Sequence, residues 1–143
     1  MAKRILVPLD KKETSEGILP LIGDMARTSG ATVRLLHVAP LPHERVGAHG
    51  RVIAYASQEM ERLEHRGLDY LKLAEAKLDG VPVESVVRFG DHVEEIIREA
   101  DAFGADLIAV TTSRRGWLRR ALGSVAERVF RKSPVQALLL GAS

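Results

Sequence analysis

Short hydrophobic runs recur along the chain and alternate with segments whose apolar residues are spaced three or four positions apart. Three of the runs are almost continuously apolar, which is typical of strands covered on both faces. We predict strands at Ile5–Leu9, Thr32–Val38, Val83–Phe89, Ala105–Thr111 and Val135–Leu140. Because strands that alternate with helices are joined by right-handed crossovers, the pattern predicts a parallel sheet in an α/β fold.

The longest helical pattern lies between Val52 and Leu78. Its apolar positions fall on one stripe of a helix, and they are Ala56, Met60, Leu63, Gly67, Tyr70, Leu71, Ala74 and Leu78. Another helix is predicted to begin at Asp91, a good N-cap residue, because Glu94 stands where it completes a capping box. Pro20 cannot lie deep inside a helix, so the first helix either begins late or is kinked there.

The composition favours one domain that spans residues 1–143. The chain is 45% hydrophobic and 28% charged, which supports both a core and a polar surface. Its lack of cysteine excludes disulfides, thiolate metal sites and a cysteine nucleophile. No apolar run approaches the roughly 18 residues of a membrane span, and the charged start MAKRILVPLD is unlike a signal peptide. We expect a cytoplasmic protein that does not contact a membrane.

Positive charge is concentrated in the C-terminal part of the chain. The formal net charge is only +2, but residues 111–143 hold seven Lys and Arg residues against a single acid, Glu127. The rest of the chain therefore carries an excess of negative charge. Such an asymmetry either marks the binding site of an anion or an acidic partner, or is simply a solvated basic face.

Several catalytic and metal-binding signatures are missing from the sequence. It contains no GxGxxG after the first strand, no GxxxxGK[ST], no GxSxG and no HExxH. We therefore expect no enzyme, slow ATP hydrolysis being the one conceivable activity. His43 and His49 share the loop Ala39–Arg51, but no third ligand is evident, so no metal site is predicted. The loop itself, with two prolines and two glycines, is typical of a lid or a disordered segment.

The other histidines have ordinary structural explanations. His37 stands near the end of an apolar strand, which predicts a hydrogen-bonded core residue rather than a ligand. His65 and His92 fall in helical segments, where surface positions are expected.

The segment from Val110 to Val129, VTTSRRGWLRRALGSVAERV, is the most informative stretch of the chain. Ser124 and Glu127 form a capping box, which explains the serine by structure alone. The same helix N-terminus, preceded by Gly123, is also an anion site, because its free N–H groups and its dipole favour negative charge. Four arginines lie just upstream and could supply countercharge: Arg114, Arg115, Arg119 and Arg120. Both interpretations remain open.

Across nearly its whole length the sequence resembles the universal stress protein family. The quoted motifs, in order, are ILVPLD, LLHVAP, FGDHVEEII, ADLIAVTT and GWLRRALGSVAERVFRKSPVQALLL. The resemblance implies an open five-stranded parallel sheet of order 3-2-1-4-5 with helices on both faces, an adenine nucleotide α-hydrolase-like and Rossmann-like fold. Ligands of such sheets bind at the carboxyl ends of the strands, where the strand order reverses.

The nucleotide-binding branch of that family has a glycine, two residues, a second glycine, nine residues and then Gly-Ser or Gly-Thr. In this chain the final pair is intact as Gly123 and Ser124, but Val110 and Ser113 occupy the two earlier glycine positions. Glycines in phosphate loops allow positive φ and a close approach of the backbone to the ligand. A valine in a left-handed conformation would cost roughly 1–3 kcal/mol. The substitutions weaken the ATP hypothesis, whereas basic residues such as Arg114 support it.

The resemblance assigns a role to each candidate binding residue. Adenine and ribose contacts are implied for Pro8, Leu9, Asp10 and Val38, and phosphate contacts for Val110, Ser113, Gly123, Ser124 and Val125. Arg114 is a candidate countercharge. ATP is the implied cofactor, with Mg²⁺ only if ATP is bound.

Three functions are compatible with these observations. The first is a regulatory protein that binds an adenine nucleotide, and the second is a nucleotide-independent dimeric interaction module of the same fold. We expect a homodimer through the last strand, Val135–Leu140, because an exposed apolar edge strand invites pairing with a second copy. The third is a binder of nucleic acid or an acidic partner through the arginines of residues 114–120. It is disfavoured because Trp117 alone offers an aromatic surface for stacking there.

Overall fold

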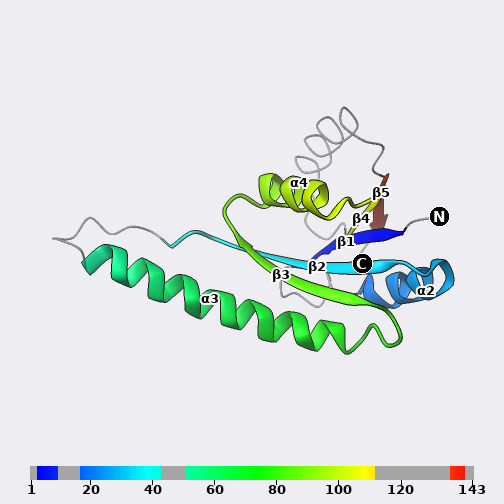
Figure 1. Cartoon of the computed structure of the whole chain (residues 1–143), viewed down its shortest axis with the longest axis horizontal. Helices are drawn as coiled ribbons and strands as arrows, with labels where there is room; N and C mark the ends of the chain where they lie inside the picture. Colours follow the sequence, from blue (N-terminus) through cyan, green and yellow to red (C-terminus); the bar gives the residue numbers. More distant parts are fainter. Residues whose placement is uncertain (1–2, 10–16, 43–50, 112–135, 141–143) are drawn as a thin grey trace.

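The computed structural model describes residues 3–9, 17–42, 51–111 and 136–140 of the chain (Figure 1). The strands are β1 (Arg4–Pro8), β2 (Thr32–Ala39), β3 (Val83–Phe89), β4 (Leu107–Thr111) and β5 (Gln136–Leu140). The helices are α2 (Leu19–Ser29), α3 (Arg51–Glu75) and α4 (His92–Phe103). All strand pairs are parallel, in the order β3-β2-β1-β4-β5. The predicted α/β class with a parallel sheet is confirmed.

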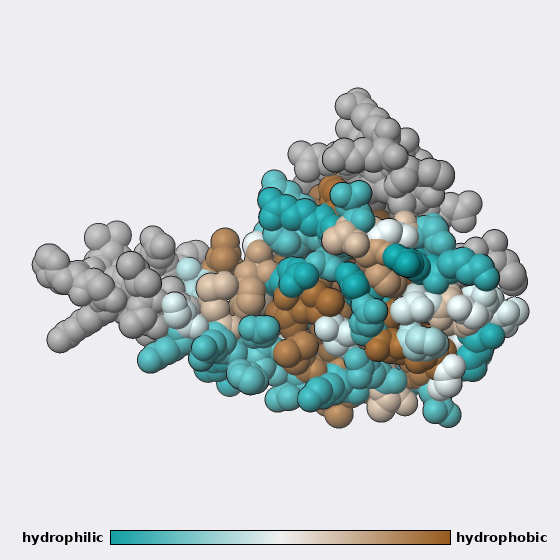
Figure 2. Space-filling model, in the orientation of Figure 1, coloured by the Kyte–Doolittle hydropathy of each residue, from teal (hydrophilic) through white to brown (hydrophobic). Residues whose placement is uncertain are grey.

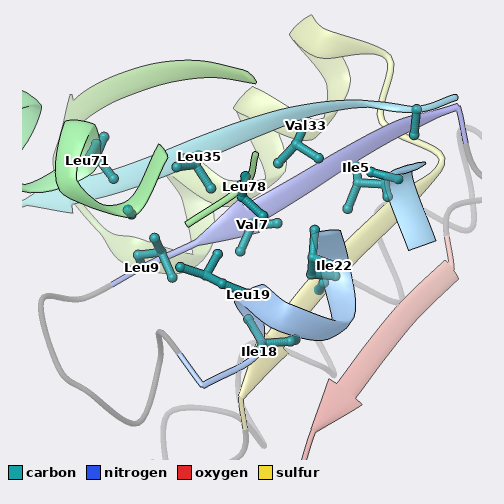
Figure 3. Packing of buried hydrophobic residues seen from close by; sticks show 14 of the residues in the cluster. Ile5, Val7, Leu9, Ile18, Leu19, Ile22, Val33, Leu35, Leu71 and Leu78 are labelled. Carbon is teal, nitrogen blue, oxygen red and sulfur yellow. The ribbon is translucent and has the colours of Figure 1, made fainter. Parts of the chain in front are cut away.

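Helices cover both faces of the sheet. Helices α2 and α3 lie on one face and α4 lies on the other (Figure 1). Successive residues of a strand point to opposite faces, so Ile5 and Val7 of β1 pack toward α2 and α3, whereas Leu6 packs toward α4. All three are fully buried. Figure 3 shows the first of these two cores, in which side chains of β1, β2, α2 and α3 meet.

The observed boundaries follow the predicted ones closely. The third strand occupies the predicted range, and α2 begins at Leu19 with Pro20 in its first turn, where a missing N–H costs nothing. Asp91 caps α4 as predicted, because its side chain accepts a hydrogen bond of 3.1 Å from the Glu94 N–H. The predicted start of the fourth strand at Ala105 is two residues early. The Ala105 N–H instead closes the end of α4 by donating to the Ala100 carbonyl at 2.9 Å.

A buried carboxylate fastens α4 to β2 and β3. Glu99 of α4 is only 3% exposed. It accepts a hydrogen bond of 3.1 Å from Arg34 Nη1 of β2 and another from Arg88 Nε of β3. Arg34 also binds Glu84 at 2.7 Å, and its guanidinium stacks 4.3 Å from the centre of the Phe103 ring. This network joins α4 to the two strands, beside the apolar contacts that Ile96 and Phe103 make with the same face of the sheet.

The surface is hydrophilic along the outer faces of α3 and α4, and hydrophobic residues show between them where β3 runs (Figure 2). On β3, Val83, Val86 and Phe89 are partly buried, while the side chains of Glu84 and Arg88 are about half exposed. Charges of this kind protect an edge strand against unwanted pairing. Among the described residues, no helix combines the length and the apolar character that a membrane crossing requires.

Candidate functional site

The candidate site lies at the carboxyl ends of β1, β2 and β4. From β1 the chain moves to β2 and β3 on one side, and through α4 it returns to β4 on the other side of β1. The strand order therefore reverses between β1 and β4. In open parallel sheets, this switch point beyond the carboxyl ends of the strands is where ligands bind.

The pairing of β1 with its two neighbouring strands ends at different residues of β1. Within the described residues, β1 pairs with β4 only at Ile5↔Leu107 and Leu6↔Ile108. Its pairing with β2 continues to Pro8↔Leu36, and beyond this the Leu9 N–H donates to the Leu36 carbonyl at 2.8 Å. Pro8 itself has no N–H with which to extend a ladder. The last residues of β1 are thus paired with β2 alone, whereas β4 continues to Thr111 without pairing to β1.

A histidine side chain reinforces the end of β1. His37 lies opposite Leu9 when the β1–β2 register is continued by one residue, and His37 Nδ1 is 3.0 Å from the Leu9 carbonyl oxygen. Because a carbonyl oxygen only accepts hydrogen bonds, Nδ1 must carry the proton and donate. His37 is 9% exposed. The prediction that it is a hydrogen-bonded core residue is confirmed.

Helix α3 encloses the His37 ring from below the sheet. Gly67 of α3 faces it so closely that an added Cβ would lie 3.2 Å from His37 Cδ2 and 2.8 Å from Val87 Cγ2. The Tyr70 ring meets the imidazole edge-on, with ring centres 6.0 Å apart. The glycine in the predicted apolar stripe of α3 therefore has a packing reason, which is to let the helix approach the strand that carries His37.

Four of the predicted ligand contacts lie at these strand ends. Pro8 is partly exposed at the end of β1, and Val38 of β2 belongs to the core under α4. The Leu9 side chain is 3% exposed and packs in the core beside α2 (Figure 3), so only its backbone faces the carboxyl edge. Val110 is in β4, paired with Leu139 of β5. The other predicted contacts lie outside the described residues: Asp10, Ser113, Arg114, Gly123, Ser124 and Val125.

The connection from β3 to α4 also reaches the carboxyl edge, which sequence reasoning did not predict as part of the site. The Gly90 N–H donates to the Ala39 carbonyl at 3.0 Å, and Gly90 has a φ of 134°, which only glycine adopts readily. An added Cβ there would lie 3.3 Å from Glu95 Oε1. Glu95 is buried and pairs with Arg98 at 3.0 Å. The Gly-Asp pair before the helix was the available signal for this close turn.

Two further histidines, His65 and His92, lie on helices. His65 is exposed on α3, as predicted, and His92 is partly exposed at the start of α4. His43 and His49 lie outside the described residues. In the described part of the chain, no three metal-binding side chains come together.

Comparison with known proteins matches nearly the whole chain to one family. The sequence model of the Universal stress protein family matches residues 1–140. No curated protein matches the chain. Among solved structures, the hypothetical protein MJ0577 is 26% identical, with a TM-score of 0.74 over 99% of this chain and 96% of that one.

Two further structures resemble the fold and were solved with nucleotides. A universal stress protein in complex with cAMP is 22% identical, with a TM-score of 0.61 over 99% of this chain and 98% of its own. A universal stress protein from Archaeoglobus fulgidus in complex with dAMP is 16% identical, with a TM-score of 0.59 over 96% of each chain.

Proposed function

The chain belongs to the universal stress protein family, and from this premise we propose that it binds an adenine nucleotide at the switch point. We propose further that it acts as a regulatory protein rather than as an enzyme. The observation that carries the proposal is the early end of the β1–β4 pairing, at Leu6↔Ile108, while β1 stays paired with β2 through Pro8↔Leu36. A ligand at the carboxyl edge can enter between two strands whose ladder has ended. Two proteins of the same fold hold cAMP and dAMP, which supports an adenine ligand.

The described residues restrict how such a ligand is held. The Leu9 and Val38 side chains are 3% and 4% exposed, so we propose that these residues contact the base and ribose through their backbones. Pro8 is the partly exposed apolar surface beside them. Asp10 would bind the ribose, and the chain from Val110 to Val125 would hold the phosphates. If the ligand is ATP, Mg²⁺ accompanies its phosphates.

The direct test is nucleotide binding by the purified chain. We expect mass spectrometry of the denatured protein to detect a co-purified adenine nucleotide, or calorimetry of the ligand-free protein to show binding of AMP or ATP. GTP serves as the base-specific control and should bind at least about tenfold more weakly, since a site shaped for one base leaves polar groups unpaired with another. Asp10→Ala should weaken binding, whereas Asp101→Ala, an exposed residue of α4, should not. Equal binding of ATP and GTP, or none of either, contradicts the proposal.

Replacing both Val110 and Ser113 by glycine is expected to increase ATP affinity. Val110 is part of β4, so the expected gain comes from closer approach of the backbone to the phosphates, and a gain of roughly 1 kcal/mol corresponds to about a fivefold change in affinity. Titration calorimetry of the parent and the double variant measures the difference. A parent that already binds ATP at low micromolar concentration and a variant that binds no better would show that these positions do not limit the site.

We also propose that the chain forms a homodimer through β5. This strand ends the strand order and pairs with β4 at Leu107↔Gln136 through Thr111↔Leu140. After Gln136 its sequence, ALLL, is apolar, and an apolar edge is prone to aggregate unless it is covered. A second copy of the same strand would satisfy the edge in an isologous, two-fold contact.

A further inference from the structure

We propose that His37 is a positioning residue for the nucleotide site, which holds the carboxyl end of β1 on β2 and away from β4. The inference rests on the proposed function, because it assigns a role within the same site. Its starting point is the bond between His37 Nδ1 and the Leu9 carbonyl, 3.0 Å long and buried.

The bond closes the last step of the β1–β2 ladder. Both backbone polar groups of Leu9 are bonded to β2, since its N–H donates to the Leu36 carbonyl at 2.8 Å and its carbonyl accepts from His37. Leu9 lies one residue beyond Pro8, the last paired residue of β1. A side chain from β2 therefore supplies the hydrogen bond that fixes the strand end.

Fixing Leu9 on β2 also decides where β1 lies relative to β4. The β1–β4 pairing ends at Leu6↔Ile108, three residues before Leu9, although β4 itself continues to Thr111. Where a strand end is hydrogen-bonded to only one neighbouring strand, that neighbour determines its position. His37 thus preserves the separation at the switch point, and it fixes the residue that directly precedes Asp10.

The surroundings of the imidazole favour a fixed orientation. It is packed against Gly67 and Val87 on the α3 side of the sheet, and the Tyr70 ring meets it edge-on. A buried donor with so little free volume keeps its hydrogen bond rather than exchanging it for water. The ring itself lies in the core, so it acts on a ligand only through the backbone of Leu9.

Two substitutions separate the donor from the ring. His37→Asn keeps a side-chain N–H the same number of bonds from Cα as Nδ1, and His37→Leu keeps apolar volume but removes the donor. Val33→Ala is the matched control, because Val33 is a fully buried residue on the same strand and the same core face, four residues toward the amino end. All three variants change the packing of this core, and only His37→Leu loses the bond to Leu9.

Two measurements test the role. For AMP affinity by calorimetry, we expect a loss of about fivefold to tenfold in His37→Leu, the size of one hydrogen bond, with near-parental affinity in His37→Asn and Val33→Ala. For amide hydrogen exchange of Leu9 in the ligand-free protein, we expect about tenfold faster exchange in His37→Leu and restoration in His37→Asn. Thermal unfolding of each variant establishes that it is folded at the temperature of measurement.

The outcomes are distinguishable from those of the proposed function. Equal AMP affinity in the parent and His37→Leu overturns the positioning role while leaving nucleotide binding intact. Equal loss of affinity in His37→Leu and Val33→Ala also overturns it, because general loss of packing would then suffice. If the parent binds no AMP, the proposed function fails. Amide hydrogen exchange of Leu9 then tests by itself whether His37 fixes the end of β1 on β2, and unchanged exchange in His37→Leu overturns that role.

Discussion

Replacing Glu99 by alanine is expected to lower the free energy of unfolding by about 2–3 kcal/mol, because the change leaves cationic side chains without their buried partner. Arg34 is affected most, since its side chain is only 19% exposed and it loses one of its two carboxylate partners, keeping Glu84 at 2.7 Å. Arg88 is about half exposed and can be solvated, so it contributes less. Thermal unfolding of parent and variant should differ by about 10 °C for a chain of this size.

The control for this prediction is Asp101→Ala, which removes an exposed carboxylate from the same helix and should change stability by less than about 0.5 kcal/mol. Glu99→Gln keeps the shape and one acceptor, so it should fall between the two. A double-mutant cycle of Arg34→Ala and Glu99→Ala then isolates their coupling. If Glu99→Ala is as stable as Asp101→Ala, the network does not hold α4 on the sheet.

The fold could be predicted from the sequence because its strands and helices have clear boundaries in the sequence. The third strand is bounded by Gly80 and Gly90, and Asp91 is followed by an acid at the capping-box position, so both ends of the β3–α4 connection are marked. The helix–strand alternation then leaves a parallel sheet as the only common arrangement. The misplaced start of β4 is a boundary error. It arose because Ala105 reads as an apolar strand residue, while its N–H is used in the cap of α4.

The site was predicted less completely because its contacts join distant segments. His37 could be read as a core residue from its apolar neighbours, but its bond to Leu9 depends on the β1–β2 register, which periodicity does not provide. Glu99 interrupts the apolar face of α4 between Ile96 and Phe103. That interruption was the available signal for a buried ion pair, but its arginine partners lie 65 and 11 residues away along the chain.

Replacing Leu138 by aspartate is expected to abolish the proposed homodimer. Leu138 is the central residue of β5, paired with Ala109 of β4, and a charge in the middle of an edge strand opposes pairing with a second copy. We expect light scattering after size-exclusion chromatography at micromolar concentration to give twice the 15.7 kDa chain mass for the parent. The variant should give the single chain mass, or precipitate because its edge is left uncovered.

Leu73→Asp supplies the matched control for the dimer. It makes the same change at a leucine of α3 that is 69% exposed, away from β5, and should leave the mass unchanged. Leu140→Lys introduces a charge at the last residue of β5. If Leu138→Asp precipitates, this milder variant shows whether the loss of the dimer can occur without loss of folding. A folded Leu140→Lys monomer supports the shared edge, since lysine is a residue that blocks strand addition. A parent that is monomeric at micromolar concentration, or a Leu73→Asp variant that dissociates in the same way, shows that β5 does not form the contact.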